Sequence, residues 1–287
     1  MGSLNIIPKF GTNLKRLMKD YLNKPGKQSL LGLIATLYSV PMTHKFIRTY
    51  YDGSVWVHKH RDGVIVDRKI NYQDSLTKYK AWTKDIYEFV YKPKPGDVIF
   101  DIGAGIGTET YYFSKIVGSN GKIVSVEAQP STYLCLNKFC KFNKLDNVIL
   151  LNLAISGDKS EVFIDNNDMH ISSKIINTKN GIKVEGTTLD LLMKRLDISI
   201  IDFMKMNIEG AEKMAIRGMS KSIKNTKYVC ISCHDFIADR DGIENMRTKR
   251  IVQDFLVKNN FKIVNRDADS RTWVRDQLNG INQNFLG

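Results

Sequence analysis

A glycine-rich turn that follows an acidic residue is the segment best suited to binding a reactive ligand. The sequence runs Asp97-Val-Ile-Phe-Asp-Ile-Gly-Ala-Gly-Ile-Gly-Thr108, so an apolar run typical of a buried strand ends in Asp101 and three glycines follow it. Glycine permits unusual backbone dihedrals and lets a ligand approach the chain closely. In an α/β sheet, a turn of this kind at the end of the first strand is where a nucleotide-like cofactor binds.

The spacing of these glycines argues against a dinucleotide. The motif G-x-G-x-x-G, counted from Gly103, requires glycine at position 108, but Thr108 stands there and the third glycine is Gly107. An ionised Asp101 would also repel a pyrophosphate at the helix N-terminus. A P-loop is excluded because no Gly-Lys-Ser/Thr follows. Asp101 suits a ligand with a cationic amino group and no phosphate, and S-adenosylmethionine (SAM) has both properties.

A second acid supports this cofactor. Glu127 ends a short apolar run, residues 122–127, and lies 24 residues after Gly103. In dinucleotide sites, an acid about 20 residues further on, at the tip of the second strand, accepts hydrogen bonds from the ribose hydroxyls. SAM keeps both hydroxyls, so Glu127 is predicted to bind its ribose.

Alternating strand and helix patterns surround these two acids from residue 97 onward. Strands are predicted at residues 98–101, 123–127, 148–154, 200–206 and 228–233, and helices at residues 79–91, 108–117, 131–143, 188–195, 210–218 and 244–259. Ser131 is the predicted N-cap of the second helix after the turn. Residues 261–266 and 271–275 are predicted to form a terminal pair of strands. This alternation is typical of a doubly wound α/β sheet.

The first 80 residues are predicted to be a separate N-terminal extension, and residues 81–287 the main domain. A basic amphipathic helix is expected at residues 13–22, a buried or interface helix within the apolar run 30–40, and a β-hairpin at residues 54–60 and 64–67. Of the net charge of +13, residues 1–80 carry +9, from 14 Lys/Arg and 5 Asp/Glu. This excess indicates an anionic partner for the extension, which serves the substrate side or oligomerisation.

Cysteine usage and hydropathy indicate a cytoplasmic protein. Only four cysteines occur, and Cys230 and Cys233 lie three apart in a strand-like run, so they are expected on opposite faces and not as a zinc or redox pair. Free thiols are typical of a reducing compartment. The longest early apolar run, residues 30–40, is shorter than the roughly 20 residues that a transmembrane helix needs. No transmembrane segment or secretory signal is therefore expected.

Five short motifs together resemble the FkbM-type SAM-dependent methyltransferases, over roughly residues 86–275. The motifs are Asp101-Ile-Gly-Ala-Gly-Ile-Gly, Glu127-Ala-Gln-Pro130, Asn152-Leu-Ala-Ile-Ser156, Thr188-Leu-Asp190 and Lys205-Met-Asn-Ile-Glu-Gly-Ala-Glu212. The first is shared by class I methyltransferases in general, and the last two narrow the resemblance to this family. The resemblance implies a Rossmann-like, mostly parallel α/β sheet of seven strands with an antiparallel last strand. It also implies O-methylation of sugar or natural-product hydroxyls.

The resemblance also implies a set of cofactor-binding residues. Asp101, Gly103 and Gly105 would line the methionine end of SAM, and Glu127 would hold the ribose. Asn152 and Ala154 would lie near the adenine or in the loop after the third strand. The predicted cofactor set is completed by neighbours within these motifs: Ala104, Thr108 and Ala128. The family usually has aspartate where this chain has Asn207, which cannot take a proton at neutral pH but can still hydrogen-bond.

Transfer of a methyl group to a hydroxyl requires a group that removes the hydroxyl proton. His234, expected at the carboxyl end of the fifth strand, is the first candidate for this base, with a bond to Asp235 as the structural alternative. Glu209 could orient the substrate or act as the base, and Glu212 is expected to interact with a helix dipole. Lys205, which alternates with Asn207 along the fourth strand, could bind an anionic substrate group or the SAM carboxylate.

A divalent metal and two other functions stay open as alternatives. Asn207, Glu209, His234 and Asp235 could offer metal ligands, but their spacing is not diagnostic, so no metal is favoured. The basic extension keeps an RNA methyltransferase open, although Asn207 argues against the ribose-methylating type. A non-catalytic SAM-binding protein is the third hypothesis. The favoured partner is a hydroxyl-bearing substrate, a glycan that could be anionic, with nucleic acid not favoured and a homo-oligomer open.

Overall fold

The computed structural model describes residues 26–71, 75–164 and 181–286. The predicted helix at residues 13–22 lies outside the described residues, as does most of the polar segment between residues 165 and 180. The chain divides into two compact units, Met1–Ser75 and Leu76–Gly287. Among the described residues, no helix is long and apolar enough to cross a membrane.

In the first unit, one helix packs on a small antiparallel sheet. The helix is α2 (Gln28–Thr43), and the sheet has the order β1 (Arg48–Tyr51), β2 (Trp56–His60) and β3 (Gly63–Asp67). The pairing of β2 with β3 confirms the predicted hairpin. The helix in the apolar run is also confirmed, but only one side of it is buried, through Leu31 and Ala35. Leu33 and Leu37 on the same helix are more than half exposed.

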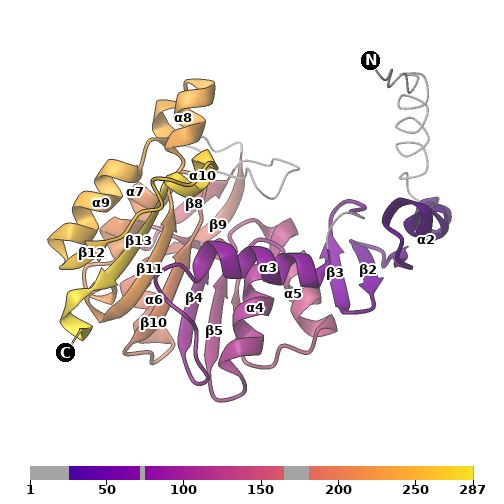
Figure 1. The fold of residues 1–287 in the computed structure, drawn as a ribbon, viewed down its shortest axis with the longest axis horizontal. Helices are drawn as coiled ribbons and strands as arrows, with labels where there is room; N and C mark the ends of the chain where they lie inside the picture. Colours follow the sequence, from indigo (N-terminus) through magenta and orange to yellow (C-terminus); the bar gives the residue numbers. More distant parts are fainter. Residues whose placement is uncertain (1–25, 72–74, 165–180, 287) are drawn as a thin grey trace. The chain divides into compact units, whose positions relative to one another are not determined.

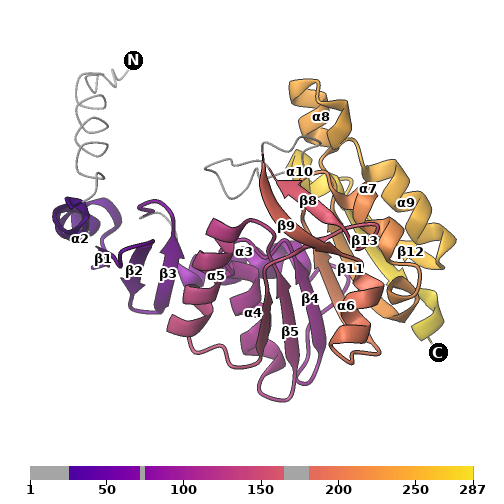
Figure 2. The same ribbon diagram turned by 180° about the vertical axis from the view of Figure 1, so that it is seen from behind.

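The second unit is built on the predicted seven-stranded sheet (Figures 1 and 2). Its strand order is β12-β13-β11-β10-β4-β5-β6. The strands are β4 (Val98–Ile102), β5 (Lys122–Val126), β6 (Val148–Leu151), β10 (Ile201–Met206), β11 (Thr226–Ser232), β12 (Phe261–Ile263) and β13 (Gln277–Asn282). Strands β4, β5, β6, β10 and β11 pair in parallel, and β13 runs antiparallel to both of its neighbours. This topology confirms the predicted fold.

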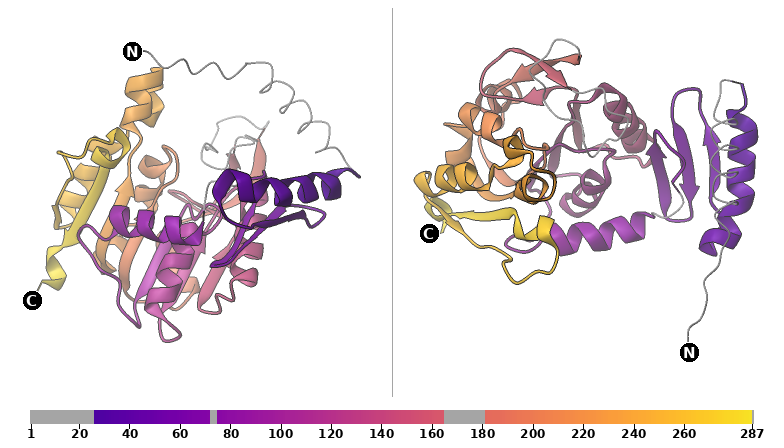
Figure 3. Two further views of the ribbon diagram at one scale, coloured as in Figure 1. Left: turned by 45° about the vertical axis from the view of Figure 1, so that its right-hand side comes forward. Right: turned by 90° about the horizontal axis from the view of Figure 1, so that it is seen from above.

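Alternation along the strands divides the core into two layers (Figure 3). Phe100 and Val229 face a cluster that includes residues from α6 (Leu189–Arg195), α7 (Glu212–Ala215) and α9 (Lys249–Lys258). Their neighbours Ile99 and Cys230 face a second cluster with α3 (Leu76–Tyr87) and α4 (Thr108–Val117). Successive side chains of a strand point to opposite faces, so near-continuous apolar strands are covered on both sides. Cys233 lies in the first cluster, opposite Cys230, and the four cysteines, all within the described ranges, form no disulfide.

Three predictions about individual elements were wrong. Residues 271–275 are not a strand: α10 (Thr272–Arg275) occupies them, and β13 begins two residues later. Residues 244–259 are not one helix, because a short 3-10 turn (Glu244–Met246) precedes α9, and α8 (Asp235–Asp241) was not predicted. The helix α5 (Pro130–Phe142) has Gln129, not Ser131, as its N-cap, because proline occupies the first helical position.

Residues 148–154 also divide differently from the prediction. The strand β6 ends at Leu151, and β7 (Ala154–Ile155) belongs to a second small sheet with the order β7-β9-β8. In that sheet β8 (Glu161–Ile164) and β9 (Ile182–Thr187) pair antiparallel. The break redirects the chain at residues 152 and 153, which brings Leu153 and Ala154 to the end of the main sheet where the glycine turn lies.

Candidate active site

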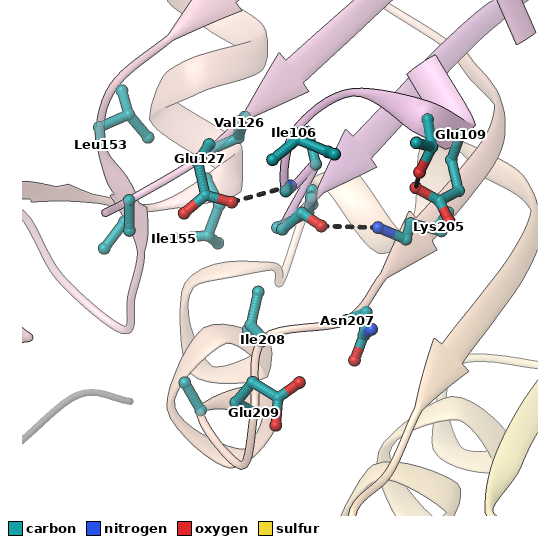
Figure 4. Close-up of a pocket in the computed structure, with 18 of the residues that line it drawn as sticks. Ile106, Glu109, Val126, Glu127, Leu153, Ile155, Lys205, Asn207, Ile208 and Glu209 are labelled. Carbon is teal, nitrogen blue, oxygen red and sulfur yellow. Dashed lines mark hydrogen bonds between the residues drawn. The ribbon is translucent and has the colours of Figure 1, made fainter. Parts of the chain in front are cut away.

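A cavity of about 320 Å³ lies at the carboxyl ends of β4, β5 and β10 (Figure 4). This is the edge of a parallel sheet at which cofactors bind. All of its lining residues belong to the second unit: Tyr79, Trp82, Ile102, Gly103, Ala104, Gly105, Ile106, Thr108, Glu109, Val126, Glu127, Ala128, Leu153, Ala154, Ile155, Ile164, Lys205, Asn207, Ile208, Glu209 and Ala211. The cavity thus collects most of the residues predicted to bind the cofactor.

The glycine turn forms the floor of this cavity. Gly103 has φ +75°, and a Cβ atom there would lie 1.9 Å from the Asn207 carbonyl oxygen. The backbone N–H groups of Gly103 and Ala104 both donate to the Val126 carbonyl oxygen, at 2.9 and 3.0 Å. Gly105 has φ +57°, but a Cβ atom there would meet nothing within 4 Å. Gly103 is therefore required for packing between strands, whereas Gly105 leaves room for a ligand.

Glu127 is held at one end of the cavity by two backbone donors. The N–H group of Gly105 donates to one of its carboxylate oxygens at 2.9 Å (Figure 4). The N–H group of Gln129 donates to the other oxygen, also at 2.9 Å. Burial raises the pKa of Glu127 to about 7, although both hydrogen bonds act in the opposite direction. Each carboxylate oxygen has a second lone pair, so Glu127 can still accept hydrogen bonds from a diol.

An apolar wall continues from Glu127. It consists of Ala128, Leu153, Ala154, Ile155 and Ile164. Asn152, predicted to contact the cofactor, does not line the cavity, and its amide instead donates to the carbonyl oxygens of Glu127 and Ala128, at 2.8 and 3.0 Å. Asn152 therefore fixes the backbone on which Glu127 stands.

Asp101 is fully buried behind the turn and does not line the cavity. Its carboxylate forms an ion pair with Lys205 Nζ at 2.9 Å and accepts a hydrogen bond from Thr110 Oγ1 at 2.6 Å. Lys205 Nζ also donates to the Gly103 carbonyl oxygen at 2.6 Å (Figure 4). Burial alone would lower the pKa of Lys205, but the Asp101 carboxylate more than compensates, so this pKa is raised. Asp101 is therefore not the free acid that its position before the glycine turn predicts.

Glu109 is a cavity acid that the sequence argument missed. It lies in the first turn of α4, and its carboxylate accepts a hydrogen bond from Thr108 Oγ1 at 2.7 Å. Its position directly after the glycine turn is the signal that could have identified it. Tyr79 and Trp82 of α3 also line the cavity and were missed, because nothing local to a helix outside the sheet reveals what its aromatic side chains face.

Asn207 and Glu209 project from the segment that follows β10 and line the cavity (Figure 4). Within the described part of the chain, the Asn207 side-chain oxygen is buried and accepts no hydrogen bond. Glu209 has φ +54°, a left-handed conformation that is strained for a residue with a side chain. Strained residues persist where surrounding contacts fix them, and they occur frequently at functional sites.

His234 lies behind Glu209 and not in the cavity lining. Its Nε2 is 3.5 Å from Glu209 Oε2, and its Nδ1 is 3.2 Å from Glu212 Oε1. Glu212 is fully buried and also accepts hydrogen bonds from the Ile208 and Gly210 N–H groups and from Thr248 Oγ1. Burial by itself would lower the pKa of His234, but the two carboxylates more than compensate and raise it to about 10.

No group of three or more His, Cys, Asp or Glu in the described ranges is arranged to hold a metal ion. Of the four side chains considered as ligands, Asp235 accepts hydrogen bonds from the Thr248 and Lys249 N–H groups at the start of α9, at 2.8 and 2.9 Å. His234 is held between two carboxylates. Both side chains therefore have structural partners.

Residues 101–263 match the family described as "Methyltransferase FkbM domain". The chain is similar to the hexuronic acid methyltransferase AglP of Haloferax volcanii, at 18% identity over 174 residues that cover 60% of this chain and 68% of that protein.

Two solved structures are also similar to this chain. One is fibrillarin from Aeropyrum pernix with natively bound SAM, with a TM-score of 0.44 and 14% identity, covering 79% of this chain and 94% of that one. The other is methyltransferase FkbM from Methylobacillus flagellatus, with a TM-score of 0.43 and 14% identity, covering 72% of this chain and 50% of that one.

Proposed function

This chain belongs to the FkbM methyltransferase family, and from that premise we propose that it transfers a methyl group from SAM to a hydroxyl group of a glycan or a small natural product. The observation that carries the proposal is the cavity, in which an open glycine turn, a diol-binding carboxylate and an apolar wall follow one another. SAM is the cofactor, and when bound it supplies a methyl group on a positively charged sulfur, an electrophile that needs no further activation.

The residues of the cavity match the parts of SAM. Glu127 would accept hydrogen bonds from the two ribose hydroxyls, and the apolar wall beyond it would hold the adenine. Gly105 leaves room for the methionine part to approach the backbone. Glu109 is the half-buried cavity acid nearest the turn in sequence and would hold the cationic amino group, a role assigned to Asp101 on sequence grounds. Asp101 would act indirectly. It fixes Lys205 by an ion pair, and Lys205 in turn donates a hydrogen bond to the Gly103 carbonyl oxygen of the glycine turn.

The net charge of the cavity supports a cationic cofactor and a hydroxyl acceptor. Glu109, Glu127 and Glu209 line it, while the charge of Lys205 is balanced by Asp101. Carboxylates accept hydrogen bonds from hydroxyl groups and repel phosphate. This balance favours a sugar-like acceptor over the RNA alternative.

Glu209 is the base in this proposal, and His234 positions it. A neutral imidazole is required to accept a proton, but the carboxylates of Glu209 and Glu212 keep His234 protonated well above neutral pH. Glu209 lines the cavity and carries the carboxylate that can accept the proton of the acceptor hydroxyl. Asn207, whose side-chain oxygen is unpaired within the described residues, would accept a hydrogen bond from a neighbouring hydroxyl.

The glycan part of the proposal draws support from AglP, which is named as a hexuronic acid methyltransferase. Titration calorimetry tests the cofactor half of the proposal, and SAM should bind at micromolar concentrations. Glu127→Ala should weaken SAM binding at least about tenfold, because a hydrogen bond from a ribose hydroxyl to a charged carboxylate contributes roughly 1.5–3 kcal/mol to the binding free energy. Incubation of cell-extract fractions with methyl-labelled SAM tests the acceptor half. Label confined to RNA or protein would reject a glycan or small-molecule acceptor.

A further inference from the structure

Two aromatic side chains of α3 form one side of the active-site cavity. Tyr79 and Trp82 lie three residues apart and therefore share a face of the helix, and both line the cavity with the carboxylates of Glu109 and Glu209. The Trp82 side chain is 46% exposed. A large apolar ring left half in solvent beside an active site is a candidate surface for a substrate.

Trp82 is held in place by a stack with a second indole. Its indole lies against that of Trp273 of α10, with ring centroids 5.0 Å apart and an interplanar angle of 13°. The Arg271 guanidinium lies over the Trp273 ring, 5.3 Å from its centroid. Trp273 therefore covers one face of Trp82, and Trp82 nevertheless stays nearly half exposed.

An ion-pair network joins α3 to the segment that carries Trp273. Asp85 of α3 pairs with Arg271 at 2.6 Å and with Arg266 at 3.2 Å, and Asp269 pairs with the same two arginines at 2.7 and 2.9 Å. Contacts with both arginines, of which Arg271 contributes most, hold the pKa of Asp269 well below its usual range. Several charges in one network fix geometry better than a single surface pair does, so Trp82 is presented in a defined orientation.

The chemistry around Trp82 selects the ligand. The face of an indole carries partial negative charge and attracts the weakly positive C–H bonds of a flat, saturated ring. The Glu209 carboxylate, which lines the same cavity and has no role assigned toward SAM, can accept hydrogen bonds from hydroxyls. A nucleotide base would also stack on Trp82, but its phosphate would meet Glu209, and the cavity cation Lys205 is paired with Asp101.

We propose that Trp82 is the stacking surface for a pyranose ring of the methyl acceptor and that Trp273 holds the Trp82 indole in place. The pyranose that stacks there carries hydroxyls and no anionic group inside the cavity. This inference rests on the proposed function, because it assigns the acceptor side of the same site. It also adds a restriction: an acidic sugar would have to direct its carboxylate away from the cavity.

Saturation-transfer NMR on the full chain loaded with S-adenosylhomocysteine tests the inference. The probes are methyl β-D-glucopyranoside, methyl β-D-glucopyranosiduronate and adenosine 5′-monophosphate. The neutral glycoside should receive saturation on its ring protons and bind more tightly than the other two. Trp82→Ala should weaken its binding about tenfold, Trp82→Phe should retain most of it, and Trp273→Ala should weaken it several-fold because Trp82 loses its support. Phe285→Ala, a partly exposed aromatic outside the cavity, is the matched control and should change nothing.

Any one of three results would overturn the proposed stacking surface. They are equal binding of the glycoside by wild type and Trp82→Ala, tighter binding of the glucuronide or the nucleotide, and no glycoside binding up to about 50 mM, where weak single-ring ligands still register. SAM calorimetry on the same samples separates the two proposals. If SAM fails to bind the wild type, the proposed function fails. If SAM binds normally but the glycoside does not, only the proposed stacking surface is rejected. Normal SAM binding by Trp82→Ala shows that this variant is folded.

Discussion

The pairing of Glu209 with His234 is the contact that favours Glu209 over His234 as the proposed base. His234 is 4% exposed and lies between two carboxylates, so its charged form is the stable one. A buried imidazolium in contact with two acids is better suited to orienting a carboxylate than to acting as a base. The left-handed backbone of Glu209 supports this orienting role of His234. The strained conformation costs on the order of 1–3 kcal/mol, which contacts around Glu209 must offset.

We expect Glu209→Gln to lower kcat at least about 100-fold, the usual contribution of a general base, with SAM affinity unchanged. His234→Gln should lower kcat less, because the base remains but loses its orientation. Steady-state kinetics with the acceptor found in the labelled extract fractions measures both. Glu185→Gln, the same change at an exposed site outside the cavity, is the control. Full activity of Glu209→Gln would place the base elsewhere.

The pH profile separates the two candidate bases by its sign. The pKa of His234 is raised from 6.5 to about 10. Stability from its ion pairs is therefore fully present below pH 6.5 and is lost as the pH rises through about 10. With Glu209 as the base, kcat should be level between pH 7 and 9 and should fall towards pH 10. If kcat instead rises about tenfold per pH unit across this range, His234 is the base.

At the scale of elements, the turn between β4 and α4 combines two glycines that serve different purposes. Gly103 is the point where the turn meets the end of β10, since a Cβ atom would overlap the Asn207 carbonyl group. Gly105 faces the cavity with open space around it. The same φ-positive backbone therefore supports strand packing at one glycine and ligand approach at the other.

Alanine at the two positions should separate packing from binding. We expect Gly103→Ala to lower the free energy of unfolding by at least about 3 kcal/mol, because backbone strain and a steric clash add. Gly105→Ala should cost only about 1–2 kcal/mol but should weaken SAM binding. Gly242→Ala is the matched control, with φ +69° and open space but no place in the cavity. Denaturant unfolding and calorimetry measure the two effects, and equal SAM affinity in Gly105→Ala and Gly242→Ala would contradict the assignment.

At the scale of the whole molecule, the described residues that line the cavity all belong to one of the two compact units. Every residue that lines the cavity lies at position 79 or later, and the second unit begins at Leu76. The core of that unit is formed by its own sheet and helices.

Removal of residues 1–75 should leave a chain that binds SAM within about threefold of the full-length affinity, since a factor of three is less than 1 kcal/mol. Circular dichroism would verify that the shortened chain keeps its α/β content, and calorimetry would compare the affinities. Lost SAM binding in a shortened chain that is still folded would show that the first unit completes the cofactor site. Transfer to the acceptor is a separate measurement on the same chain.

The sequence by itself determined the donor half of this protein. The glycine turn, Glu127 and the order of strands and helices follow from local patterns, because a turn, a strand period or a helix period is set by residues close together in the chain. Of the residues predicted to bind the cofactor, Gly103, Gly105, Thr108 and Glu127 line one cavity, together with Ala154, which the family resemblance implied. The terminal strand was misplaced because residues 271–275 contain Thr, Trp and Val, which favour strands, whereas residues 277–282 have a weaker local signal and form a strand through pairing with β11.

Only the tertiary structure decided the state of the charged groups. Asp101 is paired with Lys205, 104 residues away, which removed the free acid that local patterns suggested. His234 has two carboxylate neighbours from the segment after β10, which turned the predicted base into a fixed cation. Trp82 stacks on Trp273, although the two residues lie near opposite ends of the second unit's sequence. The physical reason is common to all three: the pKa of a side chain and the surface it presents depend on neighbours that the sheet brings together, and no local pattern specifies them.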